Sequence, residues 1–383
     1  MIIGILAFQE VLFRAFFPLP EYRYFNRSNY TPKTPNIRYI PPMRYEKRTF
    51  QSYPDTLYDF IHQLNGYGFR DEEWKISKSD DKKRIMFIGD SFLEGAMVSE
   101  GEHITDIFDD LIGSQAVETM NMGIIGTGLP EYINLLNDAV PLFQPDFVVL
   151  VLFSNDISNR RVQIPQGNLQ QEVFQKYIPR VYDLIKMFIK DEPLPFRWQS
   201  PQPFMPAVPD PMNMWTTRED ELSRHVTKEM ADFMKAGMYN IFRINYAVAE
   251  EKFLKETVDM TRYFSWIKET LKKSNSKFAV CYIPSRHQVT EWYYPFELPT
   301  CQVLCPPSMN LTTNEYQAHQ KMLKKSLNDL NIPFYDFTNM VKLEESKNNH
   351  LYWHYDDHMN EKGYRLIGTG LFNWWEKSLS SIF

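Results

Sequence analysis

The sequence has few cysteines, which limits the metal and disulfide sites that it can form. The 383-residue chain contains three. Cys281 lies in an apolar segment and is expected to be a buried thiol. Cys301 and Cys305 enclose a short segment, and two residues supply too few ligands for a zinc site. They could form a small-loop disulfide in an oxidising compartment, and a reduced pair is the alternative.

The chain also lacks an excess of basic charge. It has 42 Lys and Arg residues against 48 Asp and Glu residues, which gives a formal net charge of -6. Proteins that bind nucleic acid through its phosphates carry a basic surface, so no nucleic-acid partner is expected. The Gly-x-Gly-x-x-Gly fingerprint and the phosphate-loop lysine are missing after the first predicted strand, which argues against a nucleotide-binding α/β protein.

No apolar run reaches the roughly 18–20 residues that a membrane-spanning helix needs. Residues 1–17 are strongly apolar, but Gln9, Glu10 and Arg14 interrupt them. The segment also lacks the basic start and the small-residue cleavage site of a signal peptide. Two interpretations stay open, a remnant of a membrane anchor and an amphipathic helix docked on the core. The first implies a membrane-anchored or periplasmic protein, and a cytoplasmic location is not excluded.

The composition is that of a globular protein, with 43% hydrophobic and 23% charged residues. Residues 1–20 are expected to form an apolar helix or anchor remnant. Residues 21–64, rich in Tyr, Pro, Arg and Asn, are expected to form an extended linker or strap. Residues 65–383 are expected to form one α/β domain. Within it, residues 157–214 are crowded with proline and predict a long insertion that covers or shapes a site.

Alternating strand and helix patterns predict a mainly parallel α/β domain. Short apolar runs predict strands buried in a parallel sheet, at residues 84–88, 116–122, 146–153, 278–283 and 334–337. Apolar side chains at three- and four-residue steps and helix-capping residues predict helices, at residues 104–112, 130–140, 216–273, 313–330 and 363–375.

Ser91 follows the first of these strands at a strand-to-helix corner. Ile85 to Ile88 form the apolar run, Gly89 breaks it, and Asp90 and Ser91 follow at once. Open α/β sheets bind their ligands at the carboxyl ends of the strands. The Ser91 hydroxyl is therefore placed to meet a substrate. The alternative is that Asp90 and Ser91 only cap the following helix.

A nucleophilic serine needs a base, an acid that orients the base, and donors for the oxyanion. His358 is the candidate base, because a neutral histidine near pH 7 can take a proton. Asp356 lies two residues before it and can orient its ring from the same loop. Gly126 and Asn155 each follow a predicted strand. The N–H groups of Ser91 and Gly126 and the side-chain amide of Asn155 are the candidate oxyanion donors.

Neighbouring residues leave several roles open. Asp357 is an alternative orienting acid, and His354 is an alternative base. Asp156 is expected to brace the loop after its strand. Arg286 and His287 follow another strand and could bind an anionic group of a substrate. The simpler expectation is that these two are ordinary surface residues.

Four blocks of the chain, in this order, resemble the pattern of the SGNH (GDSL) hydrolase superfamily. The blocks are Gly89-Asp90-Ser91, Gly126, Asn155-Asp156 and Asp356-x-His358. The resemblance implies a three-layer α/β/α sandwich with a mainly parallel sheet. It also implies catalysis by Ser91, His358 and Asp356 without a metal or organic cofactor. The chain departs from many family esterases, which have Asp-x-x-His where this chain has Asp-x-His.

Further details are similar to the membrane-anchored or periplasmic bacterial branch of that superfamily, which includes alginate O-acetylation-like proteins. They are residues 65–71 before the first strand, Gly95 after the serine, and Pro284-Ser285 followed by a basic residue. The resemblance implies an esterase whose partner is an ester-bearing small molecule, lipid or polysaccharide. An O-acyltransferase that modifies a polysaccharide is the first alternative. A non-catalytic glycan-binding protein that retains the fold is the second.

Overall fold

The computed structural model describes the greater part of the predicted α/β domain. The described residues are 8–12, 45–51, 57–113, 116–157, 202–203, 228, 260–293, 318–353 and 357–382. The predictions for Asp356, for His354, for Cys301 and Cys305, and for most of the segment 157–214 lie outside these residues.

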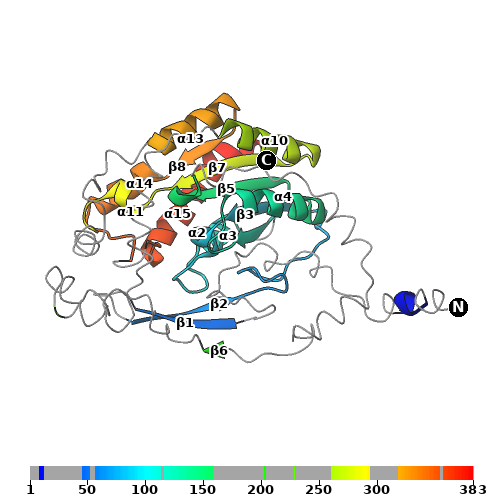
Figure 1. Ribbon diagram of the computed structural model, residues 1–383, viewed down its shortest axis with the longest axis horizontal. Helices are drawn as coiled ribbons and strands as arrows, with labels where there is room; N and C mark the ends of the chain where they lie inside the picture. The colour runs from blue at the N-terminus through cyan, green and yellow to red at the C-terminus, as the bar shows by residue number, and fades with distance from the viewer. Residues whose placement is uncertain are drawn as a thin grey trace, which may run out of the picture.

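A five-stranded, all-parallel sheet forms the centre of the described structure (Figure 1). Its strands are β3 (Lys83–Gly89), β4 (Val117–Gly123), β5 (Phe147–Phe153), β7 (Lys277–Ile283) and β8 (Phe334–Asp336). They lie in the order β4-β3-β5-β7-β8, so the direction of chain progress reverses between β3 and β5. In open α/β sheets, ligands bind beside the carboxyl ends of the strands at this reversal.

Side chains of the central strands alternate between two hydrophobic cores, because successive residues of a strand point to opposite faces. In β3, Met86 and Ile88 enter the first core, and Ile85 and Phe87 enter the second. The first core is covered by α4 (Leu129–Phe143), α10 (Thr261–Lys273) and α13 (Ala318–Asp329). The second is covered by α3 (Ile104–Ile112), α14 (Thr338–Glu345) and α15 (Glu361–Trp374). The predicted three-layer α/β/α sandwich is confirmed.

Short helical turns follow three of the strands at their carboxyl ends. They are α2 (Ser91–Glu94) after β3, η3 (Ser154–Asp156) after β5 and α11 (Arg286–Val289) after β7. Two further turns, η4 (Trp375–Leu379) and η5 (Ser380–Ile382), follow α15. The carboxyl edge of the sheet therefore carries the turns that contain Ser91, Asn155 and Arg286.

A second, smaller sheet was not predicted from the sequence. Strands β1 (Tyr45–Gln51) and β2 (Leu57–Gln63) pair antiparallel, and β6 (Gln202–Pro203) pairs with β1 (Figure 1). Both long strands fall in the segment predicted as a linker or strap. β1 has three consecutive charged residues in its centre, so it shows none of the apolar alternation by which a half-buried strand is recognised.

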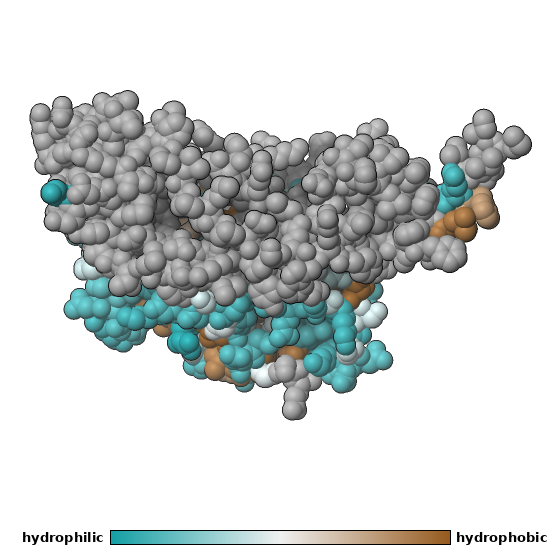
Figure 2. All heavy atoms as spheres, turned by 90° about the horizontal axis from the view of Figure 1, so that it is seen from below, coloured by the Kyte–Doolittle hydropathy of each residue, from teal (hydrophilic) through white to brown (hydrophobic). Residues whose placement is uncertain are grey.

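The described part of the N-terminal segment is a short helical turn at residues 8–12, at the right of Figures 1 and 2. Its residues Phe8, Val11 and Leu12 are exposed. The other described residues visible in Figure 2 lie along its lower edge and are mainly hydrophilic, with hydrophobic patches among them. Across the described ranges, no helix is both long and apolar enough to cross a membrane. Both interpretations of this segment stay predictions.

Candidate active site

Ser91 occupies the first position of α2, directly after β3. Asp90 caps this turn, because its Oδ1 accepts a hydrogen bond from the Phe92 N–H at 2.9 Å. A Cβ atom at Gly89 would lie 2.7 Å from the carbonyl oxygen of Val151, so only glycine fits this corner between the strands. The capping interpretation therefore holds for Asp90, while the Ser91 hydroxyl is directed elsewhere.

His358 reaches Ser91 from the far end of the chain. Its Nε2 lies 2.8 Å from the Ser91 Oγ, although 267 residues separate the two. This distance is that of a good hydrogen bond. The His358 ring also packs against the Phe92 ring, with centroids 5.1 Å apart, and Phe92 stacks on Phe153. The pair can transfer a proton from the hydroxyl to the ring.

Helix α15 carries the loop of His358 to this position. Asn360 caps the helix, because its Oδ1 accepts from the Lys362 and Gly363 N–H groups at 3.1 and 3.2 Å. The Tyr364 hydroxyl then donates to the Ala96 carbonyl at 3.0 Å, beside the end of α2. A cap and a buried hydrogen bond therefore fix the start of α15 relative to the turn of Ser91.

The two candidate orienting acids differ in their surroundings. The Asp357 Oδ1 lies 3.1 Å from the Nε of Arg286. This ion pair commits Asp357 to a partner other than the His358 ring. Asp356 lies outside the described residues, and its role as the orienting acid stays a prediction that the Asp357 ion pair favours.

Gly126 lies in the loop after β4, the strand that neighbours β3 on one side. Its φ of 75° is in the left-handed region that favours glycine. The preceding Ile125 N–H donates to the Oε2 of the buried Glu94 at 2.6 Å. Because Glu94 belongs to α2, this bond ties the Gly126 loop to the turn that carries Ser91.

Asn155 lies in η3, after β5, the strand that neighbours β3 on the other side. The next residue, Asp156, accepts hydrogen bonds from the Tyr132 hydroxyl and the Phe153 N–H, both at 3.0 Å. Asp156 braces this turn, as predicted. The Asn155 Oδ1 is buried and has no hydrogen-bond partner in the described part of the chain. Since buried polar atoms normally have partners, this oxygen has acceptor capacity that the described groups leave unused. An oxyanion would instead be bound by the Nδ2 hydrogens of the same amide, because only they can donate.

The expectation that Arg286 and His287 are surface residues is wrong. Both side chains are buried, at 1% exposure. Arg286 donates from Nη1 to the Trp353 carbonyl at 2.8 Å, in addition to its contact with Asp357. The available signal was the position of Arg286 directly after a buried strand, on the sheet edge shared with Ser91.

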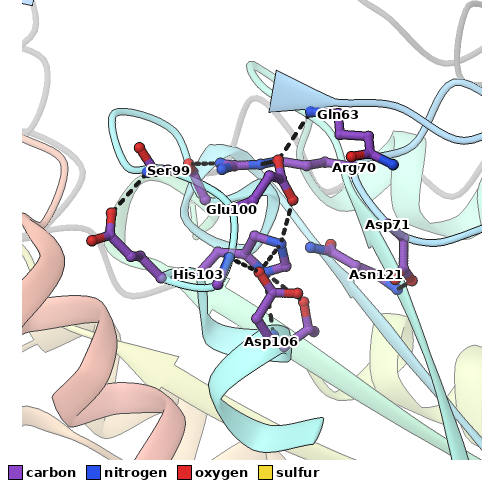
Figure 3. Close-up of polar contacts among 12 residues, drawn as sticks. Gln63, Arg70, Asp71, Ser99, Glu100, His103, Asp106 and Asn121 are labelled. Carbon is purple, nitrogen blue, oxygen red and sulfur yellow. Dashed lines mark hydrogen bonds and ion pairs between the residues drawn. The ribbon is translucent and has the colours of Figure 1, made fainter. Parts of the chain in front are cut away.

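Buried Arg70 holds the backbone that follows the turn of Ser91, and Figure 3 shows its guanidinium beside Glu100. The guanidinium donates to the backbone carbonyls of Gly95 and, at 2.8 Å, Val98, just beyond α2. Its Nε pairs with the Glu100 Oε1 at 2.7 Å, and the same oxygen accepts from the Gln63 N–H at 2.9 Å. Arg70 and Glu100 therefore join the end of β2 to the segment that follows α2.

His103 extends this network (Figure 3). Its Nε2 lies 2.7 Å from Asp106 Oδ2 and 3.8 Å from Glu100 Oε2. Burial opposes its charge, but the two carboxylates raise its pKa above the usual value. The three residue types could hold a metal ion. However, His103 Nδ1 accepts from the Asp106 N–H at 3.3 Å, which directs the ring proton to Nε2 and toward the carboxylates. The geometry favours a network of polar contacts between the His103 Nε2–H and the two carboxylates.

Glu100→Gln should destabilise the protein at neutral pH and much less in acid. Burial would raise the pKa of Glu100, but its hydrogen bond to His103 and the charges of Arg70 and His103 lower it from 4.5 to about 2. Such a carboxylate stabilises the folded state above pH 4.5, and this contribution is lost as the pH falls toward 2.

Urea unfolding of wild type and Glu100→Gln, compared at neutral pH and at the lowest pH where wild type stays folded, tests this prediction. Glu376→Gln, on the exposed side of η4, is the control and should change neither midpoint. An equal loss of stability from Glu100→Gln at both pH values would show that its charge is not the source.

Comparison with known proteins gives fold-level similarity only. No model of a known protein family matches the chain, and no curated protein matches it. Similar solved structures include an acetyl xylan esterase (15% identity, 76% of this chain, 98% of that chain, TM-score 0.36). They also include a lipolytic protein of the G-D-S-L family from Veillonella parvula (13% identity, 77% of this chain, 99% of that chain, TM-score 0.36). A psychrotrophic esterase from Pseudoalteromonas sp. is a third (11% identity, 78% of this chain, 100% of that chain, TM-score 0.39).

At these identities and TM-scores, the similarities establish neither a family nor a substrate for this chain. The fold class rests on its own sheet topology and on its two cores. The narrower resemblance to alginate O-acetylation-like proteins gains no support from these structures.

Proposed function

We propose that this protein is a serine-dependent ester hydrolase that acts on a short acyl ester of a carbohydrate or lipid. The observation that carries the proposal is the 2.8 Å contact between Ser91 Oγ and His358 Nε2. It lies at the carboxyl end of β3, beside the reversal of strand order, where α/β sheets bind their ligands.

In the proposed reaction, Ser91 Oγ bonds to the carbonyl carbon of the ester while His358 takes the hydroxyl proton. The tetrahedral intermediate collapses, the bond to the alcohol oxygen breaks, and the leaving alkoxide receives the proton from His358. A water molecule then attacks the acyl-enzyme in the same way. This second step releases the carboxylic acid and restores Ser91.

The negative oxygen of the tetrahedral intermediate needs hydrogen-bond donors. We assign this role to the N–H groups of Ser91 and Gly126 and to the amide of Asn155. Their strands are adjacent in the sheet, with β3 between β4 and β5, and neighbouring strands lie about 4.8 Å apart. Asp356 would orient the His358 ring. The scheme needs only groups of this chain, with no metal or organic cofactor.

A fluorophosphonate probe followed by mass spectrometry tests the nucleophile. Wild type should carry one adduct, on Ser91, and Ser91→Ala should carry none. Ser285 is a matched control, because it is a buried serine that follows β7 on the same edge of the sheet. Ser285→Ala should therefore label as wild type does. An unlabelled but folded wild type, or an adduct that persists in Ser91→Ala, would contradict the proposal.

The acyl acceptor is tested separately with 4-nitrophenyl acetate. A hydrolase releases acetate in water at a rate that added oligosaccharide does not increase. Transfer of the acetyl group to an added oligosaccharide in preference to water would instead identify an O-acyltransferase with the same nucleophile.

A further inference from the structure

We infer that Arg286 is a positioning residue for His358 and that it acts through Asp357 and the backbone of the same loop. This inference rests on the proposed function, because His358 is the base in that reaction. Arg286 itself does not contact the reacting atoms in this scheme.

The loop that carries His358 is closed at its base by backbone contacts. Tyr352 and Met359 form an antiparallel bridge. Next to it, the Trp353 N–H donates to the His358 carbonyl at 3.1 Å. Trp353 and His358 are therefore held side by side on the two limbs of this loop, and the position of His358 depends on how those limbs are held.

Arg286 contacts this closed loop on both of its limbs. Its Nη1 donates to the Trp353 carbonyl at 2.8 Å on the first limb, and its Nε lies 3.1 Å from the Asp357 Oδ1 on the second. One guanidinium group therefore links the two limbs, through a hydrogen bond to the first and an ion pair with the second. Lysine, with a single ammonium group on a flexible stem, cannot reproduce both contacts with this geometry.

Tyr293 and Tyr352 connect Arg286 and the segment after β7 to the base of the His358 loop. The Arg286 Cζ lies 5.4 Å from the centroid of the Tyr293 ring, at the distance of a cation–π contact. The Tyr293 hydroxyl accepts hydrogen bonds from the Leu351 and Tyr352 N–H groups at 3.1 and 3.0 Å. The Tyr352 hydroxyl in turn donates to the Pro284 carbonyl at 2.8 Å. The segment after β7 thus fixes the loop at its base and along both limbs.

Burial argues against the other possibility raised from the sequence, in which Arg286 binds an anionic group of a substrate directly. The side chain is 1% exposed, and its described contacts are to the protein itself. A residue that only positions His358 should change the turnover of bound substrate and leave substrate binding nearly unchanged.

Arg84 is a matched control for Arg286. It is equally buried, at 1% exposure, and it pairs with Glu118 at 2.9 Å. It also donates to the Lys75 and Ile76 carbonyls at 2.8 and 3.0 Å. However, Arg84 lies at the amino end of β3, the opposite end from Ser91. Arg84→Lys therefore reports the cost of disturbing a buried arginine away from the site.

Arg286→Lys should lower kcat for 4-nitrophenyl acetate by about 10- to 100-fold, as expected when a reacting group is misplaced by a fraction of an ångström. KM should change by less than about threefold, because uniform binding is unaffected. Asp357→Asn should lower kcat less than Arg286→Lys. The double variant should lose little more than Arg286→Lys, since both substitutions disturb the contact between Arg286 and Asp357. Arg84→Lys should keep kcat within about threefold of wild type.

Asp356→Asn gives a separate ranking. If Asp356 orients the ring directly and Asp357 acts only through Arg286, Asp356→Asn should impair turnover more than Asp357→Asn. The reverse ranking would overturn the positioning role by making Asp357 the orienting acid.

A readout without turnover separates this inference from the proposed function. The His358 ring signals in a ¹H–¹⁵N spectrum, assigned by their loss in His358→Ala, should shift when Ser91 is replaced by alanine. In Arg286→Lys and in Asp357→Asn, the His358 signals should move and should no longer shift when Ser91 is also replaced by alanine. In Arg84→Lys, the positions of the signals and their shift on Ser91→Ala should be those of wild type. If wild type hydrolyses no ester but the signals behave in this way, the proposed function fails and the positioning role stands.

Unchanged His358 signals together with wild-type kcat in Arg286→Lys would overturn the inference. If Arg286→Lys does not fold, Asp357→Asn decides. That variant removes the carboxylate on the second limb and keeps the arginine, and wild-type signals and kcat in it would overturn the inference equally.

Discussion

Ser91→Ala and His358→Ala should each lower kcat for ester hydrolysis by roughly 10⁴- to 10⁶-fold, and the double variant should lose little more than either. The hydroxyl and the ring are 2.8 Å apart and act as one unit, because the serine is a weak nucleophile until the ring takes its proton. Once either partner is gone, the other has no remaining part in that step.

Steady-state kinetics on wild type, Ser91→Ala, His358→Ala and the double variant measure the effect. Ser285→Ala is the control and should keep wild-type rates. Losses in the two single variants that multiply in the double variant would show that Ser91 and His358 act independently. A loss of less than about tenfold in either one would remove that residue from the reaction, since each is assigned the central proton transfer.

Asn155→Ala should lower kcat by about 100- to 1000-fold and leave the fold intact, as for the loss of one oxyanion donor. Its amide lies at the end of β5, next to the strand of Ser91, where its Nδ2 hydrogens would donate to the oxyanion. The structure of η3 is maintained instead by Asp156, whose hydrogen bonds to Tyr132 and Phe153 do not involve Asn155.

Asn155→Asp sharpens this test, because a carboxylate keeps the shape of the side chain and places negative charge beside the developing oxyanion. It should be at least as impaired as Asn155→Ala. Both variants should melt at temperatures close to that of wild type. A decrease of less than about threefold in kcat for Asn155→Ala would exclude the amide from the oxyanion site.

Elements that are buried on both sides could be predicted from the sequence because their environment dictates their composition. All seven residues of β5 are buried, so the strand appears in the sequence as an unbroken apolar run. Helix α3 begins and ends where its apolar spacing predicts, at Ile104 and Ile112. The small sheet of β1 and β2 gave no such signal, because charged residues occupy the centre of β1.

Burial of charged residues could not be predicted, because it depends on partners that are distant in the sequence. Arg286 was expected at the surface, yet its backbone partner Trp353 is 67 residues away. Arg70 and Glu94 likewise have partners in other segments, at Val98 and Ile125. A buried arginine or glutamate is stable only where such partners converge, and no local pattern encodes that convergence.

The sequence by itself determined the α/β class, the strands of the parallel sheet and the residues that follow them at its carboxyl edge, since local apolar patterning and glycine corners specify these features. Only the tertiary structure decided that Ser91 and His358 are in contact. The strand order places β3 between β4 and β5. Gly368 lets α15 pack closely on Ile107 of α3, and Tyr364 bonds to the Ala96 carbonyl. These long-range contacts place His358 at Ser91. A proton transfer requires its two groups to be close in space, and the number of residues between them does not reveal whether they are.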